Sequence, residues 1–345
     1  MNELVALEPL IELDLMNRYI APRTAVWRNE GHLPWLINAS VATGDRAPAA
    51  SAEWAQNQKI GHRAEILRTL NITGDEETFL HLHTELSPYA TVTGTLSGSL
   101  ESSLEQVMGE IEGEPVFVLL DPFAADGVRI DALQRLLSRR GRKTELLVSL
   151  DLHSFEEMCS NSAAEKIDEI IGSSLWRKLW DENGRWSSLT RVSVLYRAAL
   201  QRRGYAFARQ LPLHAPDDQR PTSQLVFASR SRLGVALMSD LACRYRRERT
   251  QAPARQIKEL RDRIHELGGR LGGASTNRIV QGLSPDLFGE FQITEYRKAI
   301  RDLVNGGVII REDASGINDD EILTFSGTSQ MALFDSSTLL NANTA

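Results

Sequence analysis

The stretch PVFVLLDPFA, residues 115–124, decides the fold. Its apolar run Val116–Leu120 has no polar alternation, which is typical of a strand buried on both faces of a sheet. Asp121 and Pro122 follow at once, and because proline fixes its own φ and donates no hydrogen bond, the chain must turn there. Ligands of open α/β sheets bind where strands end, so we expect Asp121, Pro122 and Phe123 to border a catalytic crevice.

Strand-like and helix-like segments alternate on both sides of this stretch. The segment 91–107 predicts a strand and a helix before it, residues 128–138 predict a helix after it, and residues 145–150 predict the next buried strand. This alternation predicts a mostly parallel sheet with helices on both faces. Two further strand-like runs, residues 204–213 and 223–231, suit the antiparallel edge of a methyltransferase-like fold.

The composition of the 345 residues excludes several classes of protein. The hydrophobic content of 42% and charged content of 25% are ordinary for a globular chain. A net charge of −7 argues against a surface that binds nucleic acid everywhere, although a local basic patch remains open. The two cysteines indicate neither a disulfide framework nor a zinc site. With no leader-like or membrane-spanning run, we expect a cytoplasmic protein.

The strand-like residues 33–37 and the loop after them resemble the first turn of a cofactor-binding fold, in which a strand, a small-residue loop and a helix follow one another. The apolar LPWLI is followed by the small-residue loop NASVATG, in which Asn38, Ser40 and Gly44 are candidate cofactor residues. Farther along, HRAEILRTLN predicts a helix and the alternating Thr78–Glu85 predicts a strand that ends on a carboxylate. Glu85 would then hold ribose hydroxyls, or be a solvated strand end.

The basic part of the chain begins near residue 244. Residues 244–270 hold nine Lys or Arg and four Asp or Glu, which predicts a helical linker whose Arg244, Arg246 and Arg247 contact nucleic acid. The alternative is a solvated helix face with ion pairs between residues four apart.

A small module is expected at residues 284–326. It combines an amphipathic helix over 292–305 with Thr294 as its N-cap, a double glycine, a strand VIIRE, a turn and a strand ILTF. This order is typical of a winged helix, which serves either nucleic-acid or protein contacts. For a nucleic-acid interface the candidate residues are Arg297, Lys298 and Arg301.

Several of these segments together resemble one family. VFVLLDPFAADGV, ELLVSL, SQLVFASRSRLGVALMSDL and EYRKAIRDLVNGGVI are similar to segments of the three-Cys-motif partner proteins, a bacterial and phage-borne family. The resemblance covers roughly residues 8 to 326. It implies a Rossmann-like methyltransferase core with a C-terminal winged helix, and a protein partner encoded nearby.

The resemblance also implies an altered S-adenosylmethionine site. Where the family has a DGFAGPG-like loop, this chain has residues 38–44, NASVATG, which lack the aspartate and most of the glycines. Asp121 and Phe123 remain at the DPFG-like position, where related methyltransferases bind and stack a flipped base. Ala124 replaces the glycine of that motif.

The sequence therefore predicts four regions: a Rossmann domain at 1–243, a basic helical linker at 244–283, a winged helix at 284–326 and a tail at 327–345. The leading hypothesis is a methyltransferase-like protein that acts on or beside nucleic acid in a phage, mobile-element or antiviral setting. The alternatives are an inactive scaffold that binds a partner enzyme and nucleic acid, and a winged-helix regulator whose sheet senses a ligand.

Overall fold

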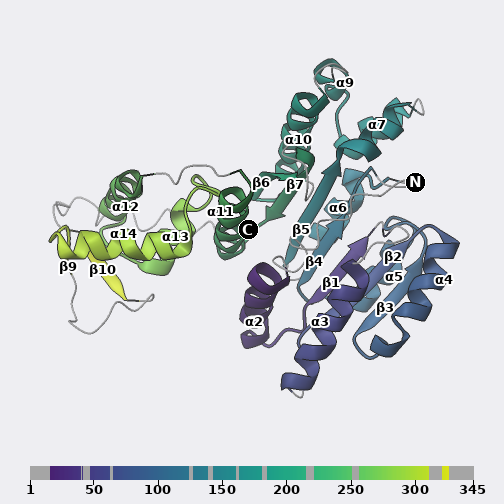
Figure 1. Ribbon diagram of the computed structural model, residues 1–345, viewed down its shortest axis with the longest axis horizontal. Helices are drawn as coiled ribbons and strands as arrows, with labels where there is room; N and C mark the ends of the chain where they lie inside the picture. Colours follow the sequence, from purple (N-terminus) through teal and green to yellow (C-terminus); the bar gives the residue numbers. More distant parts are fainter. Residues whose placement is uncertain are drawn as a thin grey trace. The chain divides into compact units, whose positions relative to one another are not determined.

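The computed structural model divides the chain into two compact units, Met1–Leu237 and Met238–Ala345 (Figure 1). The structure describes residues 16–39, 41, 47–62, 65–123, 127–138, 143–160, 163–180, 185–214, 221–250, 256–310 and 321–325. The predicted tail at 327–345 lies outside these residues. Each unit is described by itself below.

The first unit is built on a seven-stranded sheet with the order β3-β2-β1-β4-β5-β7-β6. All neighbouring strands are parallel except β7, which is antiparallel to both β5 and β6. The strands are β1 (Trp35–Ala39), β2 (Arg68–Thr73), β3 (Thr93–Ser97), β4 (Val116–Leu120), β5 (Thr144–Asp151), β6 (Phe207–His214) and β7 (Pro221–Ser229). The mostly parallel sheet predicted from the sequence is confirmed.

The strands β1 and β4 are covered on both faces, and every residue of each is buried. β4 is apolar throughout, as burial on both faces predicts, whereas β1 also contains the buried polar Asn38. Val116, Val118 and Leu120 face one core, whereas Phe117 packs on the other face against Tyr19 and Trp27. The fold-deciding stretch therefore joins two hydrophobic layers.

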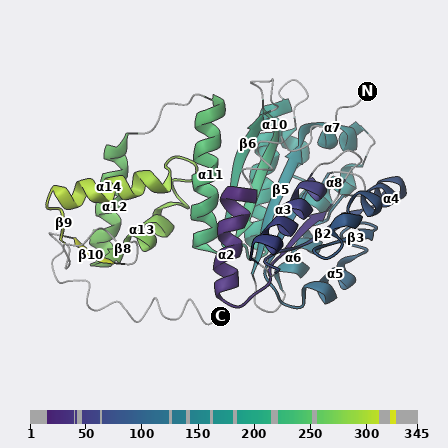
Figure 2. The ribbon, with the colours of Figure 1, turned by 60° about the horizontal axis from the view of Figure 1, so that its bottom comes forward.

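Helices cover both faces of this sheet (Figures 1 and 2). The core that contains Val116 and Val118 includes residues of α5 (Leu104–Ile111), α6 (Ile130–Leu137), α7 (Leu152–Ser160), α8 (Ala164–Ile171) and α10 (Arg185–Arg202). The opposite face carries the π-helical turn η1 (Met16–Ile20) with α2 (Ala21–Asn29), and α3 (Ala47–His62) and α4 (Glu76–Glu85). Two short helices, η2 (Ser87–Tyr89) and α9 (Trp176–Leu179), also belong to this unit.

A buried carboxylate fastens the N-terminal helices to the sheet. Glu145, in β5, is 1% exposed and accepts hydrogen bonds from the Tyr19 hydroxyl, from Arg23 Nε at 3.0 Å and from Ser229 Oγ at 3.0 Å. A Cβ at Gly234 would lie 2.5 Å from the Glu145 carboxylate. Helix α11 therefore needs a glycine at this point.

Two predicted elements next to the second strand are wrong. Residues 62–71, expected to be a helix, instead contain most of β2, and residues 78–85, expected to be a strand, belong to α4. β2 contains buried polar side chains that bond to a neighbouring strand, with Asn71 Nδ2 donating to Thr93 Oγ1 at 3.1 Å. In α4, Thr78 and Leu82 are buried four residues apart, the spacing of a helix.

The second unit contains a three-helix cluster and a small sheet. Helix α11 (Arg232–Thr250) crosses the division between the units, and α12 (Ile257–Leu271), α13 (Thr276–Leu283) and α14 (Ile293–Asn305) follow. The strands β8 (Ala274–Ser275), β9 (Ile309–Ile310) and β10 (Ile322–Phe325) form an antiparallel sheet in the order β8-β10-β9. The predicted strands VIIRE and ILTF overlap β9 and β10, and the turn between them, residues 311–320, lies outside the described residues.

The small module begins earlier than residue 284. β8 pairs with β10, and Gly268 of α12 lies against Phe325, so residues before 284 belong to the same packed unit rather than to a linker. A Cβ at Gly268 would lie 2.2 Å from the Phe325 ring. The predicted N-cap is also wrong, because Gln292 caps α14 in a reciprocal pair with Glu295.

Candidate functional site

The strand order of the large sheet reverses between β1 and β4. Ala39, Ile72 and Leu120 stand at the same level of adjacent strands, at or next to their carboxyl ends. Val41 N donates to Ile72 O at 3.0 Å, so the chain leaves β1 toward β2 and away from β4. Divergence of the chain at such a reversal creates the usual ligand site of an open α/β sheet.

Asp121 lies directly after β4, at the point where the strand order reverses. Its Oδ1 accepts a hydrogen bond from Phe123 N at 2.8 Å, which closes a tight turn, and the Pro122 carbonyl accepts from Val128 N at 3.0 Å. Pro122 is buried. The carboxylate of Asp121 is half-buried.

Phe123 packs into the core. Its ring is 3% exposed and packs edge-on against Phe155, with 4.8 Å between the ring centroids. Phe155 in turn contacts Trp176 and Trp180. Stacking on a flipped base would require Phe123 to leave this aromatic cluster. The buried position of its ring therefore does not suit the role predicted for it.

Asn38 is turned into the sheet. Its side chain is 3% exposed, and Nδ2 donates to Asn71 Oδ1 at 2.7 Å and to Ser51 Oγ at 3.2 Å. Ser40 and Gly44, the other two loop residues predicted to bind a cofactor, lie outside the described residues. Asn38 therefore ties α3 and β2 to β1 instead of lining a pocket.

Glu85 is not at a strand end. It is the last residue of α4, where it is exposed and lies 3.6 Å from His81 Nε2. The carboxylate that follows β2 is Asp75, which caps the N-terminus of α4 by accepting from Thr78 N at 2.7 Å. Hydrogen bonds from the side chain and the backbone of Thr78 hold the pKa of Asp75 below its usual range.

Asp75 is the functional candidate that sequence reasoning missed. An acidic side chain just beyond the second strand is where nucleotide-binding sheets hold ribose hydroxyls. The signal was present as Gly-Asp-Glu-Glu, a turn followed by an acidic first helical turn, which is typical of a helix start.

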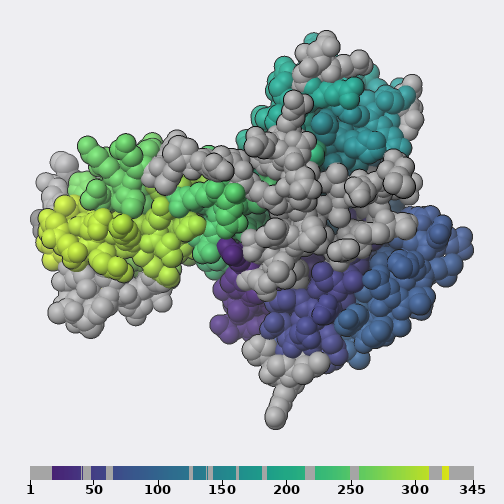
Figure 3. All heavy atoms as spheres, viewed as in Figure 1, coloured from purple at the N-terminus to yellow at the C-terminus, as the bar shows by residue number. Residues whose placement is uncertain are grey.

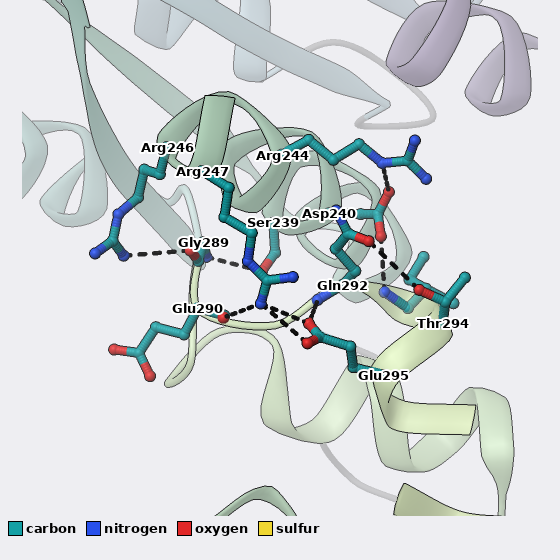
Figure 4. Close-up of polar contacts among 11 residues, drawn as sticks. Ser239, Asp240, Arg244, Arg246, Arg247, Gly289, Glu290, Gln292, Thr294 and Glu295 are labelled. Carbon is teal, nitrogen blue, oxygen red and sulfur yellow. Dashed lines mark hydrogen bonds and ion pairs between the residues drawn. The ribbon is translucent and has the colours of Figure 1, made fainter. Parts of the chain in front are cut away.

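The three predicted basic residues of α11 are bonded within the second unit (Figure 4). Arg247 reaches both carboxylate oxygens of Glu295, at 3.0 and 2.8 Å, and Arg246 donates to the Gly289 carbonyl at 3.2 Å. Arg244 lies 3.1 Å from Asp240. Burial lowers the pKa of Arg247, whereas the hydrogen bond with Glu295 and the charge of that residue raise it. The net effect is a raised pKa.

Helix α14 presents a basic surface. Arg297, Lys298 and Arg301 are exposed, while the two carboxylates of the helix face arginines of other helices. Glu295 binds Arg247, and Asp302 lies 3.8 Å from Arg261. Atoms of α14, yellow-green in Figure 3, lie on the surface of the second unit. The exposed charge of this helix is therefore positive.

The described residues contain no group of three His, Cys, Asp or Glu that could hold a metal ion. Cys243 is buried, and burial raises its pKa to about 11, so its thiol is neutral near pH 7. None of the helices in the described part of the chain is long and apolar enough to cross a membrane.

Comparison with known proteins identifies fold likenesses only. The sequence matches no protein-family model, and no curated protein matches it. A protein assigned as a caffeoyl-CoA O-methyltransferase from Staphylococcus aureus is similar over 66% of this chain and 93% of its own, with 11% identity and a TM-score of 0.33.

Two further solved structures have lower TM-scores. A protein assigned as an rRNA methylase from Clostridium thermocellum shares 9% identity over 61% of this chain and 96% of its own, with a TM-score of 0.31. A protein assigned as exported, from Bordetella parapertussis, shares 12% identity over 62% of this chain and 69% of its own, with a TM-score of 0.27.

The fold class rests on the strand order and not on these low TM-scores. The order β3-β2-β1-β4-β5-β7-β6, with β7 alone reversed, is that of Rossmann-like methyltransferases. The first unit therefore has a methyltransferase-like Rossmann fold.

Proposed function

We propose that this chain is a methyltransferase-like protein of the three-Cys-motif partner type that acts on or beside nucleic acid, in a phage, mobile-element or antiviral setting. In this proposal the second unit is a winged helix, and α14 contacts phosphates. The observation that carries it is the exposed basic face of α14, with both carboxylates of that helix paired elsewhere. A protein partner encoded nearby remains part of the proposal.

The phosphate contact is tested with charge reversal on α14. We expect Lys298→Glu with Arg301→Glu to weaken binding to duplex DNA or RNA and to flatten the salt dependence, by about two in log–log slope for DNA. Fluorescence anisotropy over a range of salt concentrations measures both quantities. The control is Lys178→Glu with Arg191→Glu, two exposed basic residues of the first unit. An unchanged slope removes α14 from the interface.

We propose that the sheet binds no S-adenosylmethionine. The described residues predicted to hold it do not fit, because Asn38 is bonded inside the sheet and Glu85 ends a helix. The burial of Phe123 argues separately against its stacking on a flipped base. Calorimetry with S-adenosylhomocysteine is expected to give no heat.

The second candidate is a cofactor-binding enzyme, which the exposed carboxylate of Asp75 favours. If S-adenosylhomocysteine binds, Asp75→Asn is the decisive variant, because asparagine also caps helices and removes only the charge. Loss of heat in Asp75→Asn but not in Glu85→Gln would establish this candidate and overturn the proposal that the sheet binds no S-adenosylmethionine.

A further inference from the structure

Several residues of α11 that belong to the second unit bond to the chain at the start of α14 (Figure 4). Ser239 Oγ accepts a hydrogen bond from Gly289 N at 3.0 Å. Asp240 Oδ1 accepts from Ile293 N, in the first residue of α14, at 2.7 Å. One helix therefore holds both the turn that precedes α14 and the first residue of α14.

An ion pair between Arg247 and Glu295 adds to these bonds. Arg247 Nη2 lies 3.0 and 2.8 Å from the two carboxylate oxygens of Glu295, and the exposed fractions of the two side chains are 27% and 16%. The Oε2 atom of Glu295 also accepts from Gln292 N at 2.8 Å, as part of the capping box of α14. The charge of Arg247 is therefore directed at the N-terminus of α14.

The exposed side chains of α14 lie on one face of the helix, because they recur at intervals of three or four residues. They are Thr294, Arg297, Lys298, Arg301 and Asn305. Since all of them are carried by one rigid helix, a change in the orientation of α14 moves the basic residues together. The bonds at the N-terminus of α14 therefore fix the direction in which its basic face points.

We propose that Asp240 and Arg247 are positioning residues for nucleic-acid binding, which orient the basic face of α14 without contacting the nucleic acid themselves. This inference rests on the proposed function of α14. It differs from the direct contact that the sequence predicts for Arg247. The apparent affinity then depends on the fraction of molecules in which α14 is correctly oriented.

The variant Glu295→Gln distinguishes positioning from direct contact, because the two roles predict opposite effects. Glutamine also serves in a capping box, so this substitution removes the charge and keeps the cap. If Arg247 contacted a phosphate, loss of the neighbouring negative charge would strengthen binding. Positioning predicts that Glu295→Gln weakens the binding of the full chain to labelled duplex DNA or duplex RNA by about five- to tenfold.

The salt dependence of binding, measured by fluorescence anisotropy, provides an independent readout for Arg247. Arg247→Gln is expected to weaken binding as much as Glu295→Gln does, with an unchanged log–log slope. Loss of a direct phosphate contact would instead lower the slope by about 0.9 for DNA. The double variant is expected to bind no more weakly than either single variant, because both substitutions remove the same interaction.

Asp240 is tested through its hydrogen-bond acceptor. Asp240→Asn keeps an oxygen that accepts from Ile293 N, so its affinity should stay close to that of the wild type. Asp240→Ala removes the acceptor and should weaken binding without a change in the salt slope. Circular dichroism checks that both variants are folded. Equal affinities of the two folded variants would overturn the role of Asp240.

The matched control is Glu266→Gln, which removes the same charge from an exposed ion pair with Arg263 on α12 and should not weaken binding. Unchanged or tighter binding by Glu295→Gln, or a lower salt slope in Arg247→Gln, would overturn the inference while leaving the phosphate contacts of α14 in place. A wild type that binds neither duplex would overturn the proposed function, and this inference with it.

Discussion

Tyr19 and Tyr196 are both fully buried, but their hydroxyl groups differ. Tyr19 donates to Glu145, whereas the Tyr196 hydroxyl has no partner among the described residues. We expect Tyr19→Phe to lower the free energy of unfolding by about 1.5–3 kcal/mol, the usual value for a hydrogen bond to a charged group. Urea titration of Tyr19→Phe and of the wild type measures this difference in the free energy of unfolding.

Tyr196→Phe serves as the matched comparison for Tyr19→Phe. It removes an unsatisfied polar atom without changing the shape of the ring, so we expect stability at neutral pH to be unchanged or raised. A loss as large as that of Tyr19→Phe would show that the Tyr196 hydroxyl has a partner in solution.

The same two tyrosines predict a loss of stability at alkaline pH. Burial raises the pKa of each, and the charges of Glu145 for Tyr19 and Asp121 for Tyr196 raise it further. Above the usual tyrosine pKa of about 10, the unfolded chain ionises while the folded chain does not, so the free energy of unfolding falls as pH rises. Below that pH this contribution is fully present.

Urea midpoints measured from about pH 8 to pH 11 test this pH dependence. Each buried tyrosine is expected to contribute a slope of up to about 1.4 kcal/mol per pH unit above its unfolded pKa. Tyr196→Phe should flatten the alkaline loss, with stability at pH 8 unchanged or raised. An identical slope in the variant and the wild type would contradict the prediction.

At the scale of single elements, replacing either of two helical glycines with alanine is expected to change the free energy of unfolding, in opposite directions at the two positions. Gly268 of α12 lies against the Phe325 ring, so Gly268→Ala overpacks the second unit and should cost about 1–3 kcal/mol. Gly109 of α5 is exposed and a Cβ there meets no atom within 4 Å, so Gly109→Ala should stabilise by up to about 1 kcal/mol.

Denaturant titration followed by circular dichroism distinguishes these two effects. Both substitutions gain the same helix propensity, so the sign of the difference reports packing alone. A stabilising Gly268→Ala would show that Phe325 does not occupy this position in solution.

How far the sequence predicts an element depends on what its side chains contact. β4 and β5 were predicted from their apolar runs, because burial on both faces leaves a clear pattern. β2 was mistaken for a helix because Thr69 and Asn71 are polar yet buried, and their partner Thr93 lies in another strand. Such partners are invisible in the local sequence.

The site was predicted less completely than the sheet. Asp121 does follow a strand end, as the Asp-Pro pair indicated, and its role in a site stays a prediction. The inward position of Phe123 was not predictable, since it depends on Phe155, which belongs to α7. Glu85 was chosen instead of Asp75 as the carboxylate for ribose hydroxyls because residues 78–85 were predicted to be a strand. They belong to the helix α4.

At the scale of the whole molecule, the open sheet of the first unit has a long edge strand. β6 has Pro212, which lacks the N–H that an added strand would bond, and prolines in sheets are confined to such edges. We expect Pro212→Val to promote self-association through this edge. Sedimentation velocity over a range of concentrations measures it, with the wild type as control, and no change in the distribution would contradict the prediction.

The bonds of Glu145 also constrain the order in which the chain can assemble during synthesis. Its partners Tyr19 and Ser229 are 126 and 84 residues away, on opposite sides of it in the sequence. While the ribosome is still adding β7, β5 has an open edge, and Glu145 lacks one partner. We therefore expect the N-terminal helices to dock late, after residue 229 has left the exit tunnel, and the nascent chain to need protection of β5 until then.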